Sequence, residues 1–394
     1  MRVLVPAPSP WDLPYGPHLY LHVPFCRAKC RYCDFVSYPG QEHLFAPYVR
    51  ALCQEMALVS GGDDIPEVAA GPATVYIGGG TPTVLPLAGL ESLVRACGEA
   101  VNWVEAEVTI EANPGTVSQE HLLGLRSLGV NRLSLGVQSF SPGSLHLLGR
   151  IHSVAEADQA LAWARQAGFD QVNLDLIFGL PSQSMAGWQR DLEEAIARTP
   201  EHLSLYALTL ETGTPLAAAV ECAEVPLPDE DLAAEMYLWA EERLAAAGYV
   251  HYEISNWARP GCWSRHNIAY WRNENYVGVG VAAHSHRGRR RWANTRDVGV
   301  YLAALEEGRH PVAEEEEVDE PTARGEAMML GLRLLAGVPH AVFTARYGAE
   351  LGSIYGPILE ELVLQGLLEV DEAGVRLTQR GRLLGNQVFA RFLP

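Results

Sequence analysis

Strand-like and helix-like segments alternate along the first half of the chain. Each apolar, strand-like run is followed by a segment with the apolar spacing of a helix. This alternation predicts strand–helix units that form a parallel sheet with right-handed crossovers. A closed barrel of such units needs eight of them, and this chain supplies six. The strands are expected near residues 19–23, 73–77, 107–111, 132–136, 171–176 and 202–208, and the helices near residues 41–60, 86–100, 118–128, 153–167 and 185–198.

Three cysteines directly follow the first of these strands. Three residues separate Cys26 from Cys30, and two separate Cys30 from Cys33. Because α/β folds hold their ligands at the carboxyl ends of the strands, the three thiolates can converge there on a single metal site. Two kinds of site fit this loop. One is zinc completed by a fourth ligand such as His22, and the other is a [4Fe-4S] cluster with one open iron.

Glycines or polar residues end four of the later strands. Gly78, Gly79 and Gly80 follow the strand near residues 73–77 and allow a ligand close to the main-chain N–H groups. An acidic or amide side chain that ends a parallel strand faces the ligand crevice more often than bulk solvent. Each is equally a candidate helix cap or core polar group when taken alone. The residues at the next three strand ends are Glu111, Gln138 and Asp175.

The cysteine loop and the glycine run one unit later resemble the radical S-adenosylmethionine (SAM) superfamily. The resemblance implies a [4Fe-4S] cluster held by Cys26, Cys30 and Cys33, with SAM chelating the open iron. It also implies an α/β fold, a partial six-unit (β/α) barrel open on one side. The implied SAM contacts are Tyr20, Tyr32, Gly79, Gly80, Thr81, Glu111, Gln138, Arg150 and Asp175; no catalytic residue is assigned.

Three further segments narrow the resemblance. Residues 171–188, 203–215 and 252–258 are similar to the oxygen-independent coproporphyrinogen III oxidase branch and its haem-chaperone relatives. Two departures favour the chaperones of the HemW type. Phe35 stands where the oxidases have a further cysteine, and the segment ahead of the cluster loop is short. The expected function is delivery of haem to an acceptor protein. The alternatives are a coproporphyrinogen III dehydrogenase and a binding module with a structural metal.

An H-N-x-x-Y-W arrangement lies at residues 266–271. A histidine can ligate haem iron while aromatic rings cover the faces of the porphyrin, although an isolated histidine is more often structural. The resemblance to the HemW-type chaperones implies haem contacts at His266, Asn267, Tyr270 and Trp271. Weaker haem candidates are His284, His286 and Cys262.

The composition limits the partners and the compartment. The chain has 29 basic and 48 acidic residues, a net charge of −19, which opposes binding to nucleic acid. No apolar run of about 18 residues and no signal-peptide start is present in this sequence, so no transmembrane segment is expected. We expect a reduced, cytoplasmic protein that binds haem and a haem-accepting protein; a homodimer is left open. Three cysteines outside the loop are expected to be structural, namely Cys53, Cys97 and Cys222.

Charge runs mark the second half of the chain. The basic stretch 286–292 reads as a solvated hairpin turn or as a site for haem propionates, and the acidic run Glu314 to Glu317 as part of a linker. After it, helices and two short strands about the turn at residues 372–374 predict an α+β winged-helix-like domain. The expected divisions are a lead-in (1–18), the partial barrel (19–215), a helical and H-N-x-x-Y-W region (216–309), the acidic linker (310–320) and the C-terminal domain (321–394).

Overall fold

The structure is a computed structural model, and it describes residues 9–61, 73–101, 103 and 105–394. Its centre is a nine-stranded sheet in the order β11-β1-β4-β5-β6-β7-β8-β10-β9. The six predicted strands form the run from β1 to β8 in sequence order, and they pair with one another in parallel. They are β1 (His18–Val23), β4 (Thr74–Gly79), β5 (Glu107–Ala112), β6 (Arg132–Gln138), β7 (Val172–Phe178) and β8 (His202–Ala207). The predicted six-unit partial barrel is therefore confirmed.

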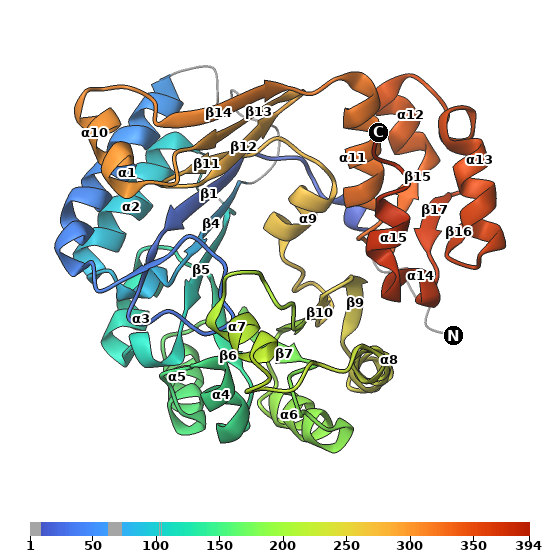
Figure 1. The fold of residues 1–394 in the computed structure, drawn as a ribbon. Coiled ribbons are helices and arrows are strands. Elements are labelled where there is room, and N and C mark those ends of the chain that lie inside the picture. Colours follow the sequence, from blue (N-terminus) through green and yellow to red (C-terminus); the bar gives the residue numbers. More distant parts are fainter. Residues whose placement is uncertain (1–8, 62–72, 102, 104) are drawn as a thin grey trace, which may run out of the picture.

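Helices cover the outer face of the curved sheet (Figure 1). The predicted helices appear within a few residues of their expected bounds, and their buried apolar faces join the outward side chains of the strands in one core. The predicted helices are α1 (Phe45–Gly61), α2 (Leu87–Ala100), α3 (Gln119–Ser127), α5 (Val154–Gln166) and α6 (Met185–Ala197), and a further helix that was not predicted is α4 (Pro142–Leu148). Short 3₁₀ helices are η1 (Pro10–Asp12), η2 (Glu42–Leu44), η3 (Pro82–Val84) and η4 (Pro114–Thr116).

The inner face of the barrel is polar. Asn173 donates to Ser134 Oγ at 2.8 Å and accepts from Ser204 Oγ at 3.1 Å, which links three neighbouring strands across the interior. His202 adds a bond of 2.7 Å to the same amide oxygen. Because side chains alternate between the two faces of a strand, the apolar residues face the helices and these polar ones face each other.

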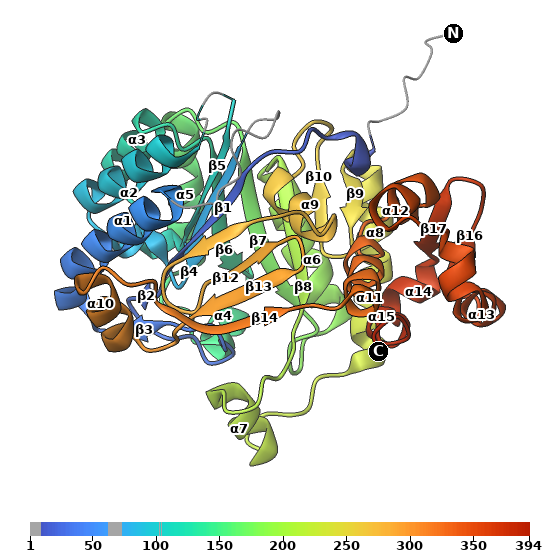
Figure 2. The same cartoon turned by 90° about the horizontal axis from the view of Figure 1, so that it is seen from above.

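Three short strands complete the sheet at its two edges. The strand β11 (Val277–Val279) pairs parallel with β1, and β10 (Asn256–Ala258) pairs antiparallel with β8 and with β9 (Val250–Glu253). The chain reaches these edges through α7 (Pro215–Glu221), α8 (Glu230–Ala246) and α9 (Arg265–Trp271). The helix α7 projects away from the body of the barrel (Figure 2).

The acidic segment is a strand rather than a free linker. The strand β14 (Val312–Glu317) pairs antiparallel with β13 (Arg290–Asn294), and β13 pairs with β12 (His284–Arg287). The basic stretch is thus a β-hairpin, and its arginines face the glutamates: Arg289 lies 2.9 Å from Glu317. Opposite charges on neighbouring strands stabilise this pairing. The helix α10 (Val298–Glu306) lies between β13 and β14 in the chain.

The C-terminal part has a core of its own, built on Met328, Phe343, Leu359 and Val388 among others. Its three-stranded sheet has the order β15-β17-β16, and the expected order of helices and two short strands is confirmed. Its elements are α11 (Glu320–Gly331), β15 (Val338–Pro339), α12 (His340–Tyr347), α13 (Leu351–Leu364), β16 (Leu368–Val370), β17 (Gly374–Leu377), α14 (Gln379–Leu383) and α15 (Gly385–Phe389). Within the described residues, no helix has the length and apolar character needed to span a membrane.

Candidate functional site

A cavity of about 470 Å³ lies at the carboxyl ends of the parallel strands. The cysteine loop forms one side of it, and the ends of β4 to β8 form the others. Eight of the nine residues expected to contact SAM line this cavity together with the three cysteines. The expected lining residues that it brings together are Cys26, Cys30, Tyr32, Cys33, Gly79, Gly80, Thr81, Glu111, Gln138, Arg150 and Asp175.

Backbone hydrogen bonds hold the cysteine loop against the barrel. Phe25 and Cys26 form the short strand β2, which pairs with β3 (Tyr38–Pro39). The Arg31 N–H donates to the carbonyl of Leu148 at 3.0 Å, which ties the loop to α4. The three cysteine side chains are half-buried and unpaired. Burial raises the pKa of the Cys26 and Cys33 thiols. Three free thiols on one loop and in one cavity fit the donor set of a [4Fe-4S] cluster.

A chain of hydrogen bonds joins Cys26 to Cys30 around the cavity wall. Thr81 Oγ1 lies 3.5 Å from Cys26 Sγ and accepts from Asn113 Nδ2 at 2.8 Å. Arg150 continues the chain, donating from Nη2 to Asn113 Oδ1 and from Nη1 to Cys30 Sγ at 3.3 Å. The chain therefore supports two of the three sulfurs as ligands.

Two glycines at the end of β4 are required by close packing. Gly79 has φ +111°, and a Cβ there would lie 2.8 Å from the ring of His22. A Cβ on Gly80 would lie 2.6 Å from the carbonyl oxygen of Phe25. The Thr81 N–H donates to that same carbonyl at 2.7 Å. The glycine run therefore lets β4 lie directly against the start of the cysteine loop.

Two half-buried carboxylates face the cavity from β5 and β7. Glu111 accepts from Tyr76 OH at 2.8 Å and from the Gly79 N–H at 3.1 Å. Burial raises the pKa of Glu111 to about 7, and the charge of Asp175 adds to the rise. Burial also raises the pKa of Asp175, which accepts from Asn173 at 2.7 Å and from Ser134 at 3.1 Å. Carboxylates so placed can bind the hydroxyl groups of a ribose.

Tyr20 does not line the cavity, contrary to its expected role as a SAM contact. Its ring stacks on Tyr76, with 6.3 Å between centroids, so it lies one layer deeper in the barrel. Its hydroxyl donates to His22 Nδ1 at 2.9 Å, while His22 Nε2 donates to the Val36 carbonyl at 2.9 Å. Both ring nitrogens of His22 are thus in use, and its role as a fourth zinc ligand does not fit this structure.

Several lining residues were not expected from the sequence. Tyr76, Asn113 and Tyr206 belong to this group, and Phe35 lines the cavity while 70% exposed. Tyr76 lies two residues before Gly78 on β4, so the alternation of a strand places both on the inner face. That alternation was a usable signal for Tyr76.

Gln138, which was expected, ends β6 with φ +68°, a strained conformation typical of functional sites.

The H-N-x-x-Y-W arrangement lies on α9, inside the barrel rather than at a surface. His266 is 1% exposed. With neutral rings, Tyr270 OH donates to His266 Nε2 at 3.1 Å, and His266 Nδ1 donates to Thr74 Oγ1 at 2.7 Å. Thr74 then donates to His18 Nδ1 at 2.8 Å, and His18 Nε2 donates to Glu274 at 2.8 Å. Burial holds the pKa of His266 well below its usual range.

Ligation of haem iron by His266 does not fit this arrangement, because both of its ring nitrogens are hydrogen-bonded. The expectation is therefore corrected: His266 and Tyr270 join α9 to the starts of β1 and β4. Asn267 and Trp271 are half-buried on the same helix, and Trp271 stacks on the guanidinium of Arg333 at 4.5 Å. These two residues stay predicted haem contacts.

The weaker haem candidates differ in exposure. His286 is buried and bonds the carbonyls of Glu274 and Gly288, whereas His284 is exposed. Cys262 is half-buried, and Gln171 Nε2 lies 3.4 Å from its sulfur.

Of the cysteines expected to be structural, Cys97 is buried, Cys53 is half-buried and Cys222 is exposed.

The chain is similar to known proteins over nearly its full length. Residues 20–195 match the radical SAM superfamily, and residues 318–384 match the HemN C-terminal domain. The chain is 37% identical to the haem chaperone HemW of Bacillus subtilis, over 95% of this chain and 98% of that protein. It is 39% identical to the haem chaperone HemW of Mycobacterium tuberculosis, over 98% of this chain and 96% of that protein.

A solved structure matches the whole fold. The coproporphyrinogen III oxidase HemN from Escherichia coli, a radical SAM enzyme, superposes with a TM-score of 0.81 at 25% identity. The match covers 96% of this chain and 90% of that chain. The barrel, its edge strands and the C-terminal part therefore recur together in one molecule.

Proposed function

Because the chain belongs to the radical SAM superfamily and, within it, to the family of the HemW haem chaperones, we propose that it binds haem and delivers it to acceptor proteins. The observation that carries the proposal is the cavity in which three free thiols, Arg150 and two half-buried carboxylates meet. Phe35 supports the chaperone over the oxidase, since an exposed phenyl group stands where the oxidases carry a further cysteine.

Family membership implies a [4Fe-4S] cluster and SAM. Cys26, Cys30 and Cys33 would hold the cluster, and Glu111, Asp175 and the main chain around Gly79 would hold SAM. When bound, a reduced cluster supplies one electron to the sulfonium of SAM. The chain itself contributes orientation: Arg150 fixes Cys30, and Thr81 fixes Cys26. All seven cysteines are unpaired, as in proteins of the reducing cytoplasm, and we place the protein there.

A carrier of haem needs no radical, so we assign the two cofactors a gating role. The cysteine loop contributes Cys26, Tyr32 and Phe35 to the cavity wall, so a bound cluster and SAM would fix the shape of that wall. Ligands that bind one conformation preferentially raise its population. We propose that the haem-accepting conformation is the one they stabilise.

An anaerobic haem titration tests the function. Cluster-loaded protein is expected to give a Soret band that saturates with added haem and to pass that haem to an apo-haemoprotein. The triple variant Cys26→Ala, Cys30→Ala, Cys33→Ala is expected to lose the transfer. Transfer at the wild-type rate in the triple variant would show that the gating role is wrong. A wild-type protein without any Soret change would remove the proposed function itself.

His266→Ala separates a haem ligand from a structural histidine. Since both ring nitrogens bond within the barrel, the variant is expected to lower the free energy of unfolding by about 1–3 kcal/mol and to keep the haem affinity within about twofold. Thermal unfolding and the Soret titration measure the two effects. His43→Ala, at an exposed position, is the control. A large loss of haem affinity at unchanged stability would restore His266 as an iron ligand.

The likeness to HemN supports a second candidate, an oxygen-independent coproporphyrinogen III oxidase. It is the less favoured of the two, because the identity to HemN is 25% and the identity to the HemW chaperones is 37–39%. Incubating the reduced, cluster-loaded protein with coproporphyrinogen III and SAM distinguishes them. Decarboxylated product formed with consumption of SAM would displace the chaperone assignment.

A further inference from the structure

One extended segment separates the cofactor cavity from a second pocket. The segment follows β8, and its residues Leu208, Thr209 and Glu211 line the cavity. Leu210 and Thr212 of the same segment line the second pocket. Neighbouring residues of one backbone segment therefore line the two spaces. Whatever occupies the second pocket lies beside the cofactor site.

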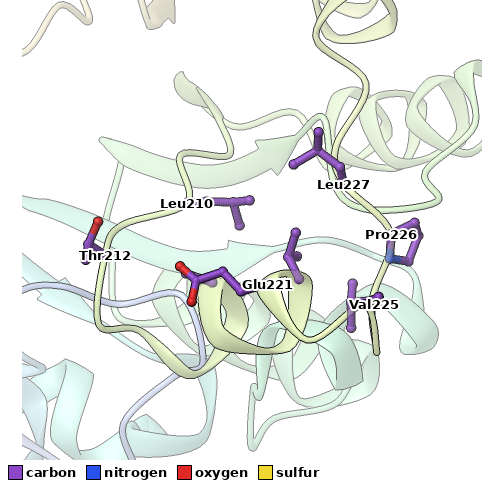
Figure 3. A pocket seen from close by; sticks show the side chains of 9 residues that line it. Leu210, Thr212, Glu221, Val225, Pro226 and Leu227 are labelled. Atoms are coloured by element: carbon purple, nitrogen blue, oxygen red, sulfur yellow. The ribbon is translucent and has the colours of Figure 1, made fainter.

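The second pocket is an apolar groove of about 630 Å³ between this segment and α7 (Figure 3). Leu210 reaches into it from the wall, and Leu227 faces the same space from the return segment after α7. Leu227 is 74% exposed, an unusual position for a large apolar side chain beside other apolar groups. The groove is lined by Leu210, Thr212, Ala217, Val220, Glu221, Ala223, Val225, Pro226 and Leu227.

The segment that lines this groove carries acidic and no basic side chains, because residues 210–227 contain no arginine and no lysine. Glu221 lines the groove, and Glu224 lies between its lining residues Ala223 and Val225. Both glutamates are exposed, and in the described part of the chain neither forms an ion pair. An apolar floor with an acidic rim is complementary to a ligand that is both apolar and basic.

The groove is fixed to the cluster loop. The Leu216 N–H donates to the carbonyl of Arg31 at 2.8 Å, and Thr214 caps α7 by accepting from the Ala217 N–H. Leu216, Ala217 and Ala219 are buried, so α7 is a packed element and not a loose arm. Arg31 lies between Cys30 and Cys33. A ligand that displaces α7 would therefore also displace the loop that would hold the cluster.

We propose that this groove is the docking site for the haem-accepting protein, through a basic and apolar segment of that partner. The inference rests on the proposed function and names the kind of partner surface that it needs. Haem itself is the poorer occupant, because its propionates are anionic and Glu221 lines the groove. A partner bound here is separated from the cavity by the segment after β8 only. Transfer of haem from the cavity to the partner requires such proximity.

Peptide binding to the full-length, cluster-loaded protein tests the proposal. The probe is a fluorescein-labelled amphipathic peptide of leucine and lysine, about 18 residues or five helical turns long. A peptide of leucine and glutamate with the same pattern is its counterpart. Fluorescence anisotropy at several salt concentrations is expected to show binding of the lysine peptide that weakens with salt, and no binding of the glutamate peptide. Equal binding of both peptides would overturn the proposal.

Three variants locate the binding. Glu221→Arg with Glu224→Arg is expected to weaken the lysine peptide by about tenfold, and Leu227→Ser by severalfold. Glu360→Arg with Glu372→Arg makes the same change of net charge on exposed positions of the C-terminal part, and is expected to change the affinity less than about twofold. A similar loss in both double variants would mean unspecific attraction by the net charge, and full affinity in Leu227→Ser would exclude the groove.

The Soret titration on the same variants separates this inference from the proposed function. Wild-type protein and Leu227→Ser are expected to bind haem equally, while the transfer of haem to an acceptor falls in Leu227→Ser. If Leu227→Ser loses haem binding and haem displaces the peptide from the wild type, the groove belongs to haem and the docking proposal fails. If the wild type binds the peptide but no haem, the proposed function is wrong. The partner of the groove can then no longer be identified as a haem-accepting protein.

Discussion

At the scale of single residues, the cavity depends on side chains that the sequence marks unequally. The cysteines and Glu111 stand out because they follow strands in a fixed pattern. Asn113 does not, since an asparagine before a proline reads as a turn. Its importance comes from its bonds to Thr81 and Arg150, which are distant in sequence and meet it only in the folded barrel. Tertiary pairing of this kind leaves no periodic signal.

Asn113→Ala tests the hydrogen-bonded chain around the cavity. The change removes the partner of both Thr81 and Arg150, and a lost hydrogen bond to a charged group costs about 1.5–3 kcal/mol. We expect the affinity for SAM to fall by about tenfold or more while the iron and sulfide content stays constant. Equilibrium dialysis with labelled SAM measures the first, and chemical analysis the second. Asn386→Ala, at an exposed position, is the control; unchanged affinity in Asn113→Ala would contradict the assigned role.

At the scale of elements, the sequence predicted the strands and helices that are long enough to show a periodic apolar pattern. The six strands from β1 to β8 and their helices follow from apolar spacing over whole segments. The strand β11 has three residues, Val-Gly-Val, which are too few to show a period, and only pairing with β1 makes it a strand. The sequence of the acidic strand β14 predicts a linker, because a run of glutamates is typical of a solvated segment and only the pairing with β13 supplies the opposite charge.

The ion pairs between β13 and its neighbours are expected to differ in strength. Arg291 pairs with Glu326 on α11 where both side chains are about one-fifth exposed, whereas Arg289 and Glu317 are more than half exposed. Glu326→Ala leaves a partly buried charge unpaired and is expected to cost about 1–3 kcal/mol, against less than about 0.5 kcal/mol for Glu317→Ala. Urea unfolding measures both. Equal costs would mean that the half-buried pair contributes no more than the exposed one.

Glu55 on α1 is expected to make stability depend on pH. It accepts from the Gly280 N–H at 2.8 Å and from Tyr301 OH at 2.5 Å, yet burial raises its pKa to about 7. Between pH 4.5 and 7 the folded chain therefore keeps a proton that the unfolded chain has released. The free energy of unfolding falls as the pH rises through this window, by about 3 kcal/mol at 1.36 kcal/mol per pKa unit.

Urea midpoints between pH 4.5 and 8 measure this slope. The raised pKa values of Glu111 and Glu253, also about 7, act in the same direction. Glu55→Gln is expected to lose the part of the slope that this carboxyl contributes, about 3 kcal/mol between pH 4.5 and 7. Glu99→Gln, on the exposed side of α2, is expected to leave it unchanged. A slope as steep in Glu55→Gln as in the wild type would show that Glu55 is ionised throughout.

At the scale of the whole molecule, Arg272 joins three parts of the chain that the sequence keeps apart. It is 2% exposed, pairs with Glu274 at 2.7 Å and donates to the Leu13 carbonyl at 2.8 Å. Its own carbonyl accepts from Arg346 Nη1 at 2.9 Å. The residues after η1, the helix α9 and the C-terminal part therefore meet at one residue, the first through its guanidinium and the last through its main-chain carbonyl. The sequence gives no hint of this junction, because arginine is the usual cation throughout this chain.

Arg272→Lys is expected to loosen this junction without unfolding the barrel. Lysine keeps the charge opposite Glu274 but has no planar fork with which to reach the carbonyl of Leu13 as well. Amide hydrogen exchange is expected to quicken in residues 9–15, by about tenfold for each 1.4 kcal/mol lost, and to stay constant in β4 to β7. It is also expected to stay constant in residues 340–347, since the bond of Arg346 to the Arg272 carbonyl does not involve the side chain. Arg380→Lys, at an exposed position, is the control. Unchanged exchange in residues 9–15 would mean that the junction does not depend on the Arg272 guanidinium.

The pairing of β1 with β11 sets the order in which the molecule can be finished during translation. The first strand of the barrel finds its outer neighbour only at residues 277–279, so it remains an open edge until the ribosome has passed that point. Open edges invite pairing with other chains. The cysteine loop therefore lies next to an unpaired edge strand during most of the synthesis of the chain. The three residues of β11 pair with that edge only late.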